Sequence, residues 1–202
     1  MRAILTLMII LAGLCSALAQ GSVIFVNGFA VFPTVADRRV YGPDCAPLVG
    51  TNYVAGLFYL PGADQDFSGS TAGTQAGPLA TFRPPTTALP GVWLNPITAG
   101  NPRVLEGVVP GSTATLQVRV WDITQFSSWD AALHGGGFHL ASAPFNYTVP
   151  YTGEPIDYYM DNLRAFGPAS CPEPSVPALL GLGALAWLWL RQKGQGRGRP
   201  FR

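Results

Sequence analysis

Two pairs of aspartates have the residue type that general acid and base catalysis needs. Asp122 and Asp130 form one pair. Asp157 and Asp161 form the other, and they would share one face of a strand predicted over 157–163. The residues beside this second pair suit a binding strip or a strand edge equally well, and they are Tyr158, Tyr159 and Asn162.

The other requirements of catalysis are not met. No serine lies in a Gly-x-Ser-x-Gly elbow, and neither histidine has a nucleophile near it in the sequence. His134 and His139 flank three glycines, which is not the helical spacing of a metalloprotease site. We therefore expect two surface-loop histidines and a body with no enzymatic activity, no metal and no cofactor.

The segment Asp64-Gln65-Asp66-Phe67-Ser68-Gly69 has the alternating oxygen ligands that open a calcium loop. In an EF-hand the bidentate glutamate would fall at position 75, which is Gln75, and no helices are predicted to flank the loop. A polar turn after Pro61 and Gly62 is the simpler interpretation, and calcium binding is the alternative.

Two cysteines, Cys45 and Cys171, remain if an N-terminal signal is removed, which suits an oxidising compartment. A bond between them would close a loop of about 125 residues and contribute on the order of 4–5 kcal/mol. The alternative is two unrelated thiols, with Cys171 free to meet another chain.

The net charge of the body excludes nucleic acid as a partner. Between Gln20 and Cys171 there are six arginines, no lysine and ten acidic residues, so the body is near −4. Nucleic-acid binding needs a cationic footprint, which this body lacks.

Aromatic residues indicate carbohydrate binding as a second possible function, because their rings can stack on sugar rings. Trp121 lies opposite Leu116, Val118 and Val120 in the alternation of its strand, which favours exposure. The candidates for ligand binding are Trp121, Tyr158 and Tyr159, with Trp93 and Trp129 as further aromatics.

Short strands and turns must position these residues. Seven strands are predicted, over 22–27, 52–60, 80–82, 92–94, 114–122, 145–149 and 157–163. A single helical turn, 128–133, has Ser128 as its cap, Asp130 near its start and Gly135-Gly136-Gly137 after it. This pattern predicts an all-β body over 20–166, an antiparallel β-sandwich of the immunoglobulin-like or jelly-roll type.

The N-terminus is typical of a signal peptide over 1–19. Arg2 precedes an apolar stretch, and Ala17 and Ala19 occupy the two positions that signal peptidase recognises. We expect export through the Sec machinery and cleavage after Ala19. Acylation of Cys15 is disfavoured because Leu14 stands where a small residue is needed.

The C-terminus has three parts that follow a stalk over 167–171. Pro172-Glu173-Pro174-Ser175 is stiff and extended, because proline can neither continue a helix nor donate to a sheet. An apolar run, 176–190, predicts a single transmembrane helix, although it is shorter than the roughly 17–25 residues of a normal span. The tail, 191–202, would hold the C-terminus in the cytoplasm, and its stop-transfer cations are Arg191, Lys193, Arg197 and Arg199.

This ending, 172–202, resembles the PEP-CTERM sorting signal of Gram-negative bacteria. Pro172 to Ser175 stand at the family motif, and Ala178-Leu179-Leu180-Gly181-Leu182-Gly183 is similar to its usual helix start. The resemblance implies that a membrane-embedded exosortase processes the chain near the motif. Cys171 stands where valine is common, and glycine and glutamine dilute the basic tail.

The body more loosely resembles exported PEP-CTERM proteins of the Verrucomicrobia type, through Arg39 to Gly42, Tyr53 to Phe58 and Thr115 to Asp122. The resemblance supports class and location and brings no catalytic motif. We therefore expect a non-catalytic cell-surface or extracellular-matrix protein, anchored in the inner membrane until processing. A module that binds carbohydrate or exopolysaccharide is the alternative.

Overall fold

The computed structural model describes residues 20–28, 36–68, 72–94, 102–151, 158–169 and 171. The chain divides into two compact units, Met1–Pro168 and Ala169–Arg202, and of the second only Ala169 and Cys171 are described. The signal peptide, sorting motif, transmembrane helix and basic tail expected from the sequence lie outside the described residues. Among the described residues, no helix is both long and apolar enough to cross a membrane.

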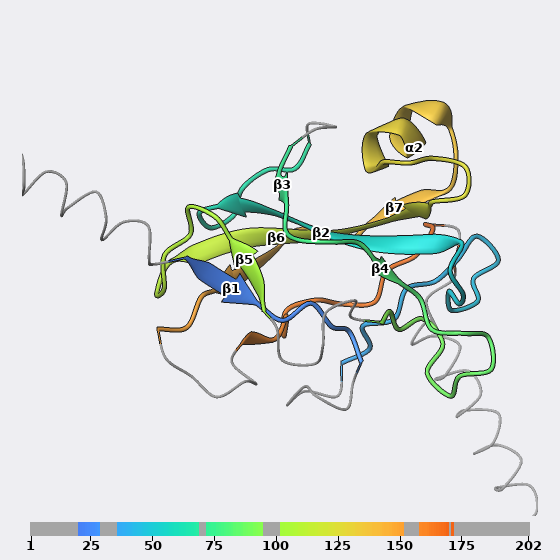
Figure 1. Ribbon diagram of the computed structural model, residues 1–202, viewed down its shortest axis with the longest axis horizontal. Coiled ribbons are helices and arrows are strands. Elements are labelled where there is room, and N and C mark those ends of the chain that lie inside the picture. Colours follow the sequence, from blue (N-terminus) through green and yellow to red (C-terminus); the bar gives the residue numbers. More distant parts are fainter. Residues whose placement is uncertain are drawn as a thin grey trace, which may run out of the picture. The chain divides into compact units, whose positions relative to one another are not determined.

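A six-stranded antiparallel sheet is the centre of the first unit (Figure 1). Its two long strands are β2 (Tyr53–Pro61) and β6 (Thr113–Asp122), which pair with each other along their length. Two short strands extend the sheet beside β2, and two others beside β6. These are β3 (Thr74–Gln75) and β4 (Ala80–Thr81) on β2, and β7 (His139–Ala141) and β8 (Phe145–Thr148) on β6.

A smaller, two-stranded sheet consists of β1 (Gly21–Val23) and β5 (Arg103–Leu105), again antiparallel. The residues after β1 continue as extended chain, and Ile24 forms a single parallel bridge to Tyr159. The prediction of an all-β body is therefore confirmed at the level of antiparallel sheets with little helix.

The sequence predicted the long strands better than the short ones. Segments 52–60, 80–82, 114–122 and 145–149 correspond to β2, β4, β6 and β8, and segment 22–27 overlaps β1 at its start. The prediction of a strand over 157–163 is wrong for its described part, because the Leu163 N–H turns back to donate to the Met160 carbonyl. Segment 92–94 contributes one bridge, between Trp93 and Phe82, and no strand. Strands β3, β5 and β7 were not predicted.

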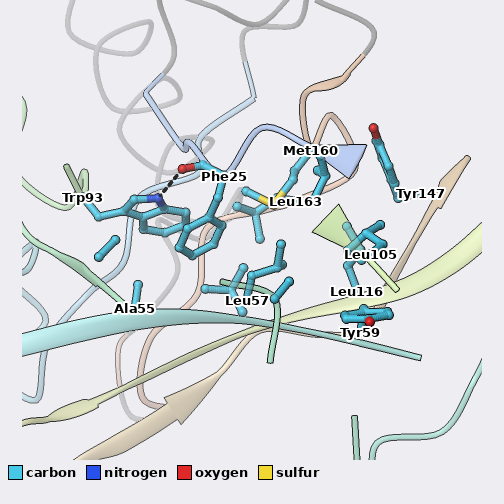
Figure 2. Packing of buried hydrophobic residues seen from close by; sticks show 14 of the residues in the cluster. Phe25, Ala55, Leu57, Tyr59, Trp93, Leu105, Leu116, Tyr147, Met160 and Leu163 are labelled. Carbon is cyan, nitrogen blue, oxygen red and sulfur yellow. Dashed lines mark hydrogen bonds between the residues drawn. The ribbon is translucent and has the colours of Figure 1, made fainter. Parts of the chain in front are cut away.

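A large apolar core covers one face of the main sheet. Alternate residues of β2, namely Ala55, Leu57 and Tyr59, point into it. Figure 2 shows Phe25, Trp93, Met160 and Leu163 packed over them from segments outside the sheet. The rings of Phe25 and Trp93 stack with centroids 4.6 Å apart, and Trp93 Nε1 donates to the Phe25 carbonyl at 3.1 Å.

A buried amide connects three of these outer segments. Asn27 donates to the carbonyls of Arg38 and Gly91, both at 2.9 Å, and accepts from the Trp93 N–H at 3.1 Å. Irregular chain buried on a core needs such partners, because its backbone groups have no ladder to satisfy them. The Asn27 side chain thus adds to the backbone hydrogen bonds that join these segments, such as that from the Val40 N–H to the Gly91 carbonyl.

The other face of the main sheet is covered as well. Helix α2 (Trp129–Gly135) lies over it, and Trp129 and Ala132 pack on Val54, Phe58 and Trp121. The helix was predicted correctly, including its cap: the Ser128 hydroxyl accepts from the Ala131 N–H at 3.2 Å. Gly136 ends the helix in the left-handed conformation, at φ 70°.

Candidate functional site

The first aspartate pair is not assembled for catalysis. Asp122 accepts from the Thr124 N–H and from Gln125 Nε2, at 2.9 and 2.8 Å, so it caps the turn that ends β6. The Thr124 hydroxyl also donates to the Asp122 carboxylate. This bond is the largest cause of a lowered pKa of Asp122, and the other hydrogen bonds lower it further. Asp130 instead faces its helical neighbour His134, 3.4 Å away on the exposed side of α2.

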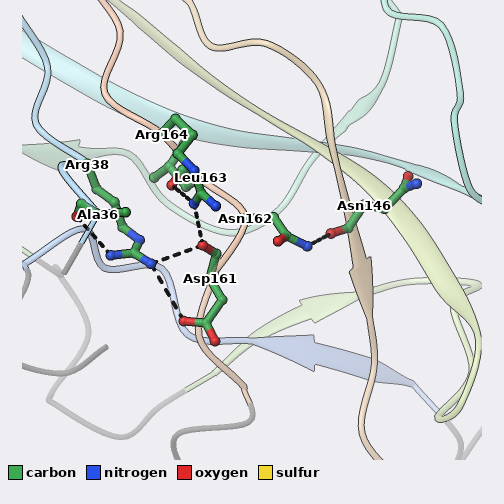
Figure 3. Close-up of polar contacts among 7 residues, drawn as sticks. All are labelled: Ala36, Arg38, Asn146, Asp161, Asn162, Leu163 and Arg164. Carbon is green, nitrogen blue, oxygen red and sulfur yellow. Dashed lines mark hydrogen bonds and ion pairs between the residues drawn. The ribbon is translucent and has the colours of Figure 1, made fainter. Parts of the chain in front are cut away.

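Asp161, of the second pair, takes part in a structural contact, while Asp157 lies outside the described residues. Figure 3 shows Asp161 beside the guanidinium of Arg38. Nη2 of Arg38 donates to the Asp161 carbonyl at 3.0 Å and lies 3.8 Å from its carboxylate. Arg164 donates to the same carbonyl at 2.7 Å, and Asn162 donates to the Asn146 carbonyl at 3.0 Å. Together these bonds fasten 161–164 to 36–38 and to β8.

The residues of the alternative calcium loop hold a polar loop in place. Asp64 and Asn146 exchange two hydrogen bonds, of 2.9 and 2.7 Å, which fix the loop after β2 against β8. Asp66 accepts from Ser68, and these bonds lower the pKa of Asp66. Gln75, at the position of the missing glutamate, lies in β3. No group of three or more potential metal ligands occurs in the described ranges.

The two histidines do not converge. His134 is exposed in the last turn of α2, where its Nδ1 forms a hydrogen bond of 2.9 Å with the Asp130 carbonyl. His139 is not in a surface loop, because it is the first residue of β7 and is half-buried. Its ring packs edge-on against the ring of Trp129, with the centroids 5.6 Å apart. The expectation of two loop residues is therefore wrong.

The expected exposure of Trp121 is also wrong. Its side of β6 was predicted correctly, but that side lies under α2, so only 1% of the residue is exposed. Its indole N–H donates to the Phe126 carbonyl at 3.1 Å, and its ring meets Trp129 edge-on. A sugar could not stack on Trp121 without lifting α2. Tyr158 and Tyr159 are half-buried beside Ile24, and the Tyr158 carbonyl accepts the Ile24 N–H at 2.8 Å.

Both body cysteines, Cys45 and Cys171, are disulfide-bonded in the structure. Cys45 has a positive φ of 60° in the turn after Tyr41, a conformation that non-glycine residues seldom adopt. Their pairing with each other stays a prediction.

Buried arginines are the feature that the sequence did not indicate. Arg38, Arg103 and Arg119 are each 1–2% exposed. Arg119 is well provided with partners: it donates to Gln117 and to the Ala72 carbonyl, at 2.8 and 2.7 Å. Its guanidinium also lies over the ring of Phe58, 4.4 Å from the centroid, and near Phe67 and Trp129. This aromatic cage explains how a charged residue lies under α2.

Arg103 has fewer partners. Nη1 donates to the Ala76 carbonyl at 2.7 Å, and the guanidinium lies 4.1 Å from the centroid of Phe25. Nε and Nη2 are buried, and neither has a hydrogen-bond partner among the described residues. Burial lowers the pKa of Arg103 to about 10, so it stays charged at neutral pH.

The described residues thus contain no assembled catalytic site, and comparison with other proteins adds no assignment. No family model, no curated protein and no solved structure matches the chain.

Proposed function

We propose that this chain is an exported, non-catalytic cell-surface or matrix protein that an exosortase processes at its C-terminal tail. The observation that carries the proposal is the order of three segments: Pro172-Glu173-Pro174-Ser175, an uncharged apolar run over 176–190, and a basic end. An extended, stiff motif can enter a protease cleft, and the run behind it retains the precursor at the inner membrane.

The organisation of the chain supports this proposal. The division into compact units falls at Ala169, three residues before the motif. The body has neither a cationic footprint nor a catalytic group that the described residues bring together. Signal peptidase and the Sec machinery would act first, at Ala17-Leu18-Ala19, and leave Gln20 as the N-terminus.

We further propose that the body is a β-sandwich. The core of Figure 2 is bounded on one side by β2 and β6, and Leu105 of the small sheet packs into it from the other side. Two antiparallel sheets on one core support this architecture, with irregular segments completing the smaller layer.

The test is the mass of the mature protein from its native host, with and without the exosortase. Processing predicts a chain that begins at Gln20 and ends near Pro172, and that requires the exosortase. Replacing Pro172 and Glu173 with alanine should leave membrane insertion intact and block maturation. Pro168→Ala, a proline change outside the motif, is the matched control and should mature normally.

One result would contradict the proposal. If the tail through Arg202 persists equally in the host with the exosortase and in the host without it, the segment is a plain membrane anchor.

A further inference from the structure

The expected first residue of the mature chain lies at the edge of the folded body. Gln20 is exposed, whereas the next residue, Gly21, is buried as the first residue of β1. The Gly21 N–H donates to the Val108 carbonyl at 2.5 Å, and Gly21 pairs with Leu105 of β5. The β-sheet structure therefore begins one residue after Gln20.

The backbone of Gly21 is packed tightly. A Cβ on Gly21 would lie 2.8 Å from Cγ2 of Val149 and 2.9 Å from the Val108 carbonyl oxygen, closer than such contacts allow. If Gln20 were trimmed away, the amide of Gly21 would become an ammonium at this buried position. Burial of a charge is unfavourable. The body is therefore more stable while the peptide bond between Gln20 and Gly21 is intact.

Glutamine can protect this bond by itself once it carries a free α-amine. The amine nitrogen attacks the carbon of the side-chain carboxamide, and a five-membered lactam, pyroglutamate, forms. The C–N bond of the carboxamide breaks, and its nitrogen leaves as ammonia with the proton that the amine loses. The reaction balances without an oxidant, a reductant or a co-reactant. It removes an α-amino group whose ordinary pKa of about 8 keeps it largely charged at neutral pH.

We propose that Gln20 is a modification site, at which the mature chain closes its N-terminus as pyroglutamate. Aminopeptidases need a free α-amine, so the lactam prevents trimming and keeps the nitrogen of Gly21 in an uncharged peptide bond. The exposure of Gln20 leaves the reacting groups accessible, also to an enzyme that catalyses the cyclisation. The inference rests on the proposed cleavage after Ala19.

The test is the mass of the N-terminal peptide of the mature protein from its native host. Chymotrypsin digestion of the denatured protein cuts after Phe25, and the peptide 20–25 should be lighter than its unmodified form by one ammonia. Cleavage after Leu116 releases a second peptide, which begins with Gln117 and is the internal control. Gln117 gains a free amine only in the digest, so its ammonia loss measures cyclisation during preparation. The loss should be nearly complete at Gln20 and small at Gln117.

Gln20→Met is the matched variant, because its side chain has a similar length and no carboxamide. The mature variant should keep a free α-amine, and an aminopeptidase should remove its residue 20. The same enzyme should leave the wild-type chain intact until pyroglutamyl aminopeptidase has opened its N-terminus.

Three results would overturn the proposal. A free α-amine on Gln20 would mean that cleavage after Ala19 is right and the modification wrong. Equal ammonia loss at Gln20 and Gln117 would mean that the lactam forms only in the digest. A mature chain that starts at another residue would refute the cleavage and the modification together. The masses at the tail report the exosortase proposal separately, so each idea can fail alone.

Discussion

Arg103 and Arg119 are equally buried, yet replacing each with methionine should affect stability differently. Methionine keeps an unbranched apolar side chain in the site, so the comparison isolates the guanidinium. Arg119 has two hydrogen bonds and three aromatic rings around it. Arg103 has one hydrogen bond and one ring.

The expected magnitudes follow from these contacts. Burial lowers the pKa of Arg103 to about 10, which corresponds to a burial penalty of about 3 kcal/mol at about 1.4 kcal/mol per pKa unit. One hydrogen bond of about 1 kcal/mol and one cation–π contact of about 1–2 kcal/mol offset it. Arg103→Met should therefore change the free energy of unfolding by no more than about 1 kcal/mol. Arg119→Met loses about twice as many contacts and should be destabilised by about 2 kcal/mol.

The assay is urea unfolding of the full-length protein in detergent, followed by tryptophan fluorescence, because Trp93 and Trp121 are both buried. The two variants are compared with wild type and with Arg164→Met, which should differ little. A loss of more than about 3 kcal/mol in Arg103→Met would refute the reasoning, since it would mean that the buried cation is fully compensated.

Three further predictions concern the turns and the cysteines. Ser128→Ala removes the cap of α2 and should lower the free energy of unfolding by about 1 kcal/mol, whereas the neighbouring Ser127→Ala should not. Asp122→Asn should be destabilising at neutral pH by about 1 kcal/mol, measured by the same unfolding assay. Because the folded pKa of Asp122 lies below its unfolded value of 3.8, its contribution is complete above that value and is lost as the pH falls through the folded pKa, so the difference between the two proteins should shrink as the pH falls below 3.8. Non-reducing peptide mapping should find Cys45 bonded to Cys171; a dimer that disappears on reduction would instead indicate pairing between chains.

The long strands and the helix could be predicted because their signals are local. In β6, apolar residues alternate with polar ones from Thr113 to Val120, and the period alone fixes which side chains share a face. In α2, Ser128 and Gly136 mark both ends. The strands that were missed have two or three residues each, too few to show a period, and β5 begins with an arginine.

The candidate site was harder to predict because burial is not local. Alternation correctly placed Trp121 and Arg119 opposite Leu116, Val118 and Val120, but it does not say whether that opposite face is covered. The cover comes from α2 and from Phe67, a residue far away in the sequence. An aromatic on a supposedly open strand face was therefore a misleading candidate for sugar binding.

The burial of Arg103 was equally hard to predict. An arginine inside a short strand was the sequence feature available at Arg103, flanked by Pro102 and Val104. Alternation places Arg103 and Leu105 on one side of β5 and exposed Val104 on the other, so the cation must face the apolar side. Such a placement is unfavourable unless something compensates the charge, and within the described residues one hydrogen bond and one ring do so only in part. Stability alone would favour an apolar residue at position 103, so the pattern of the sequence gives no indication that this arginine is buried.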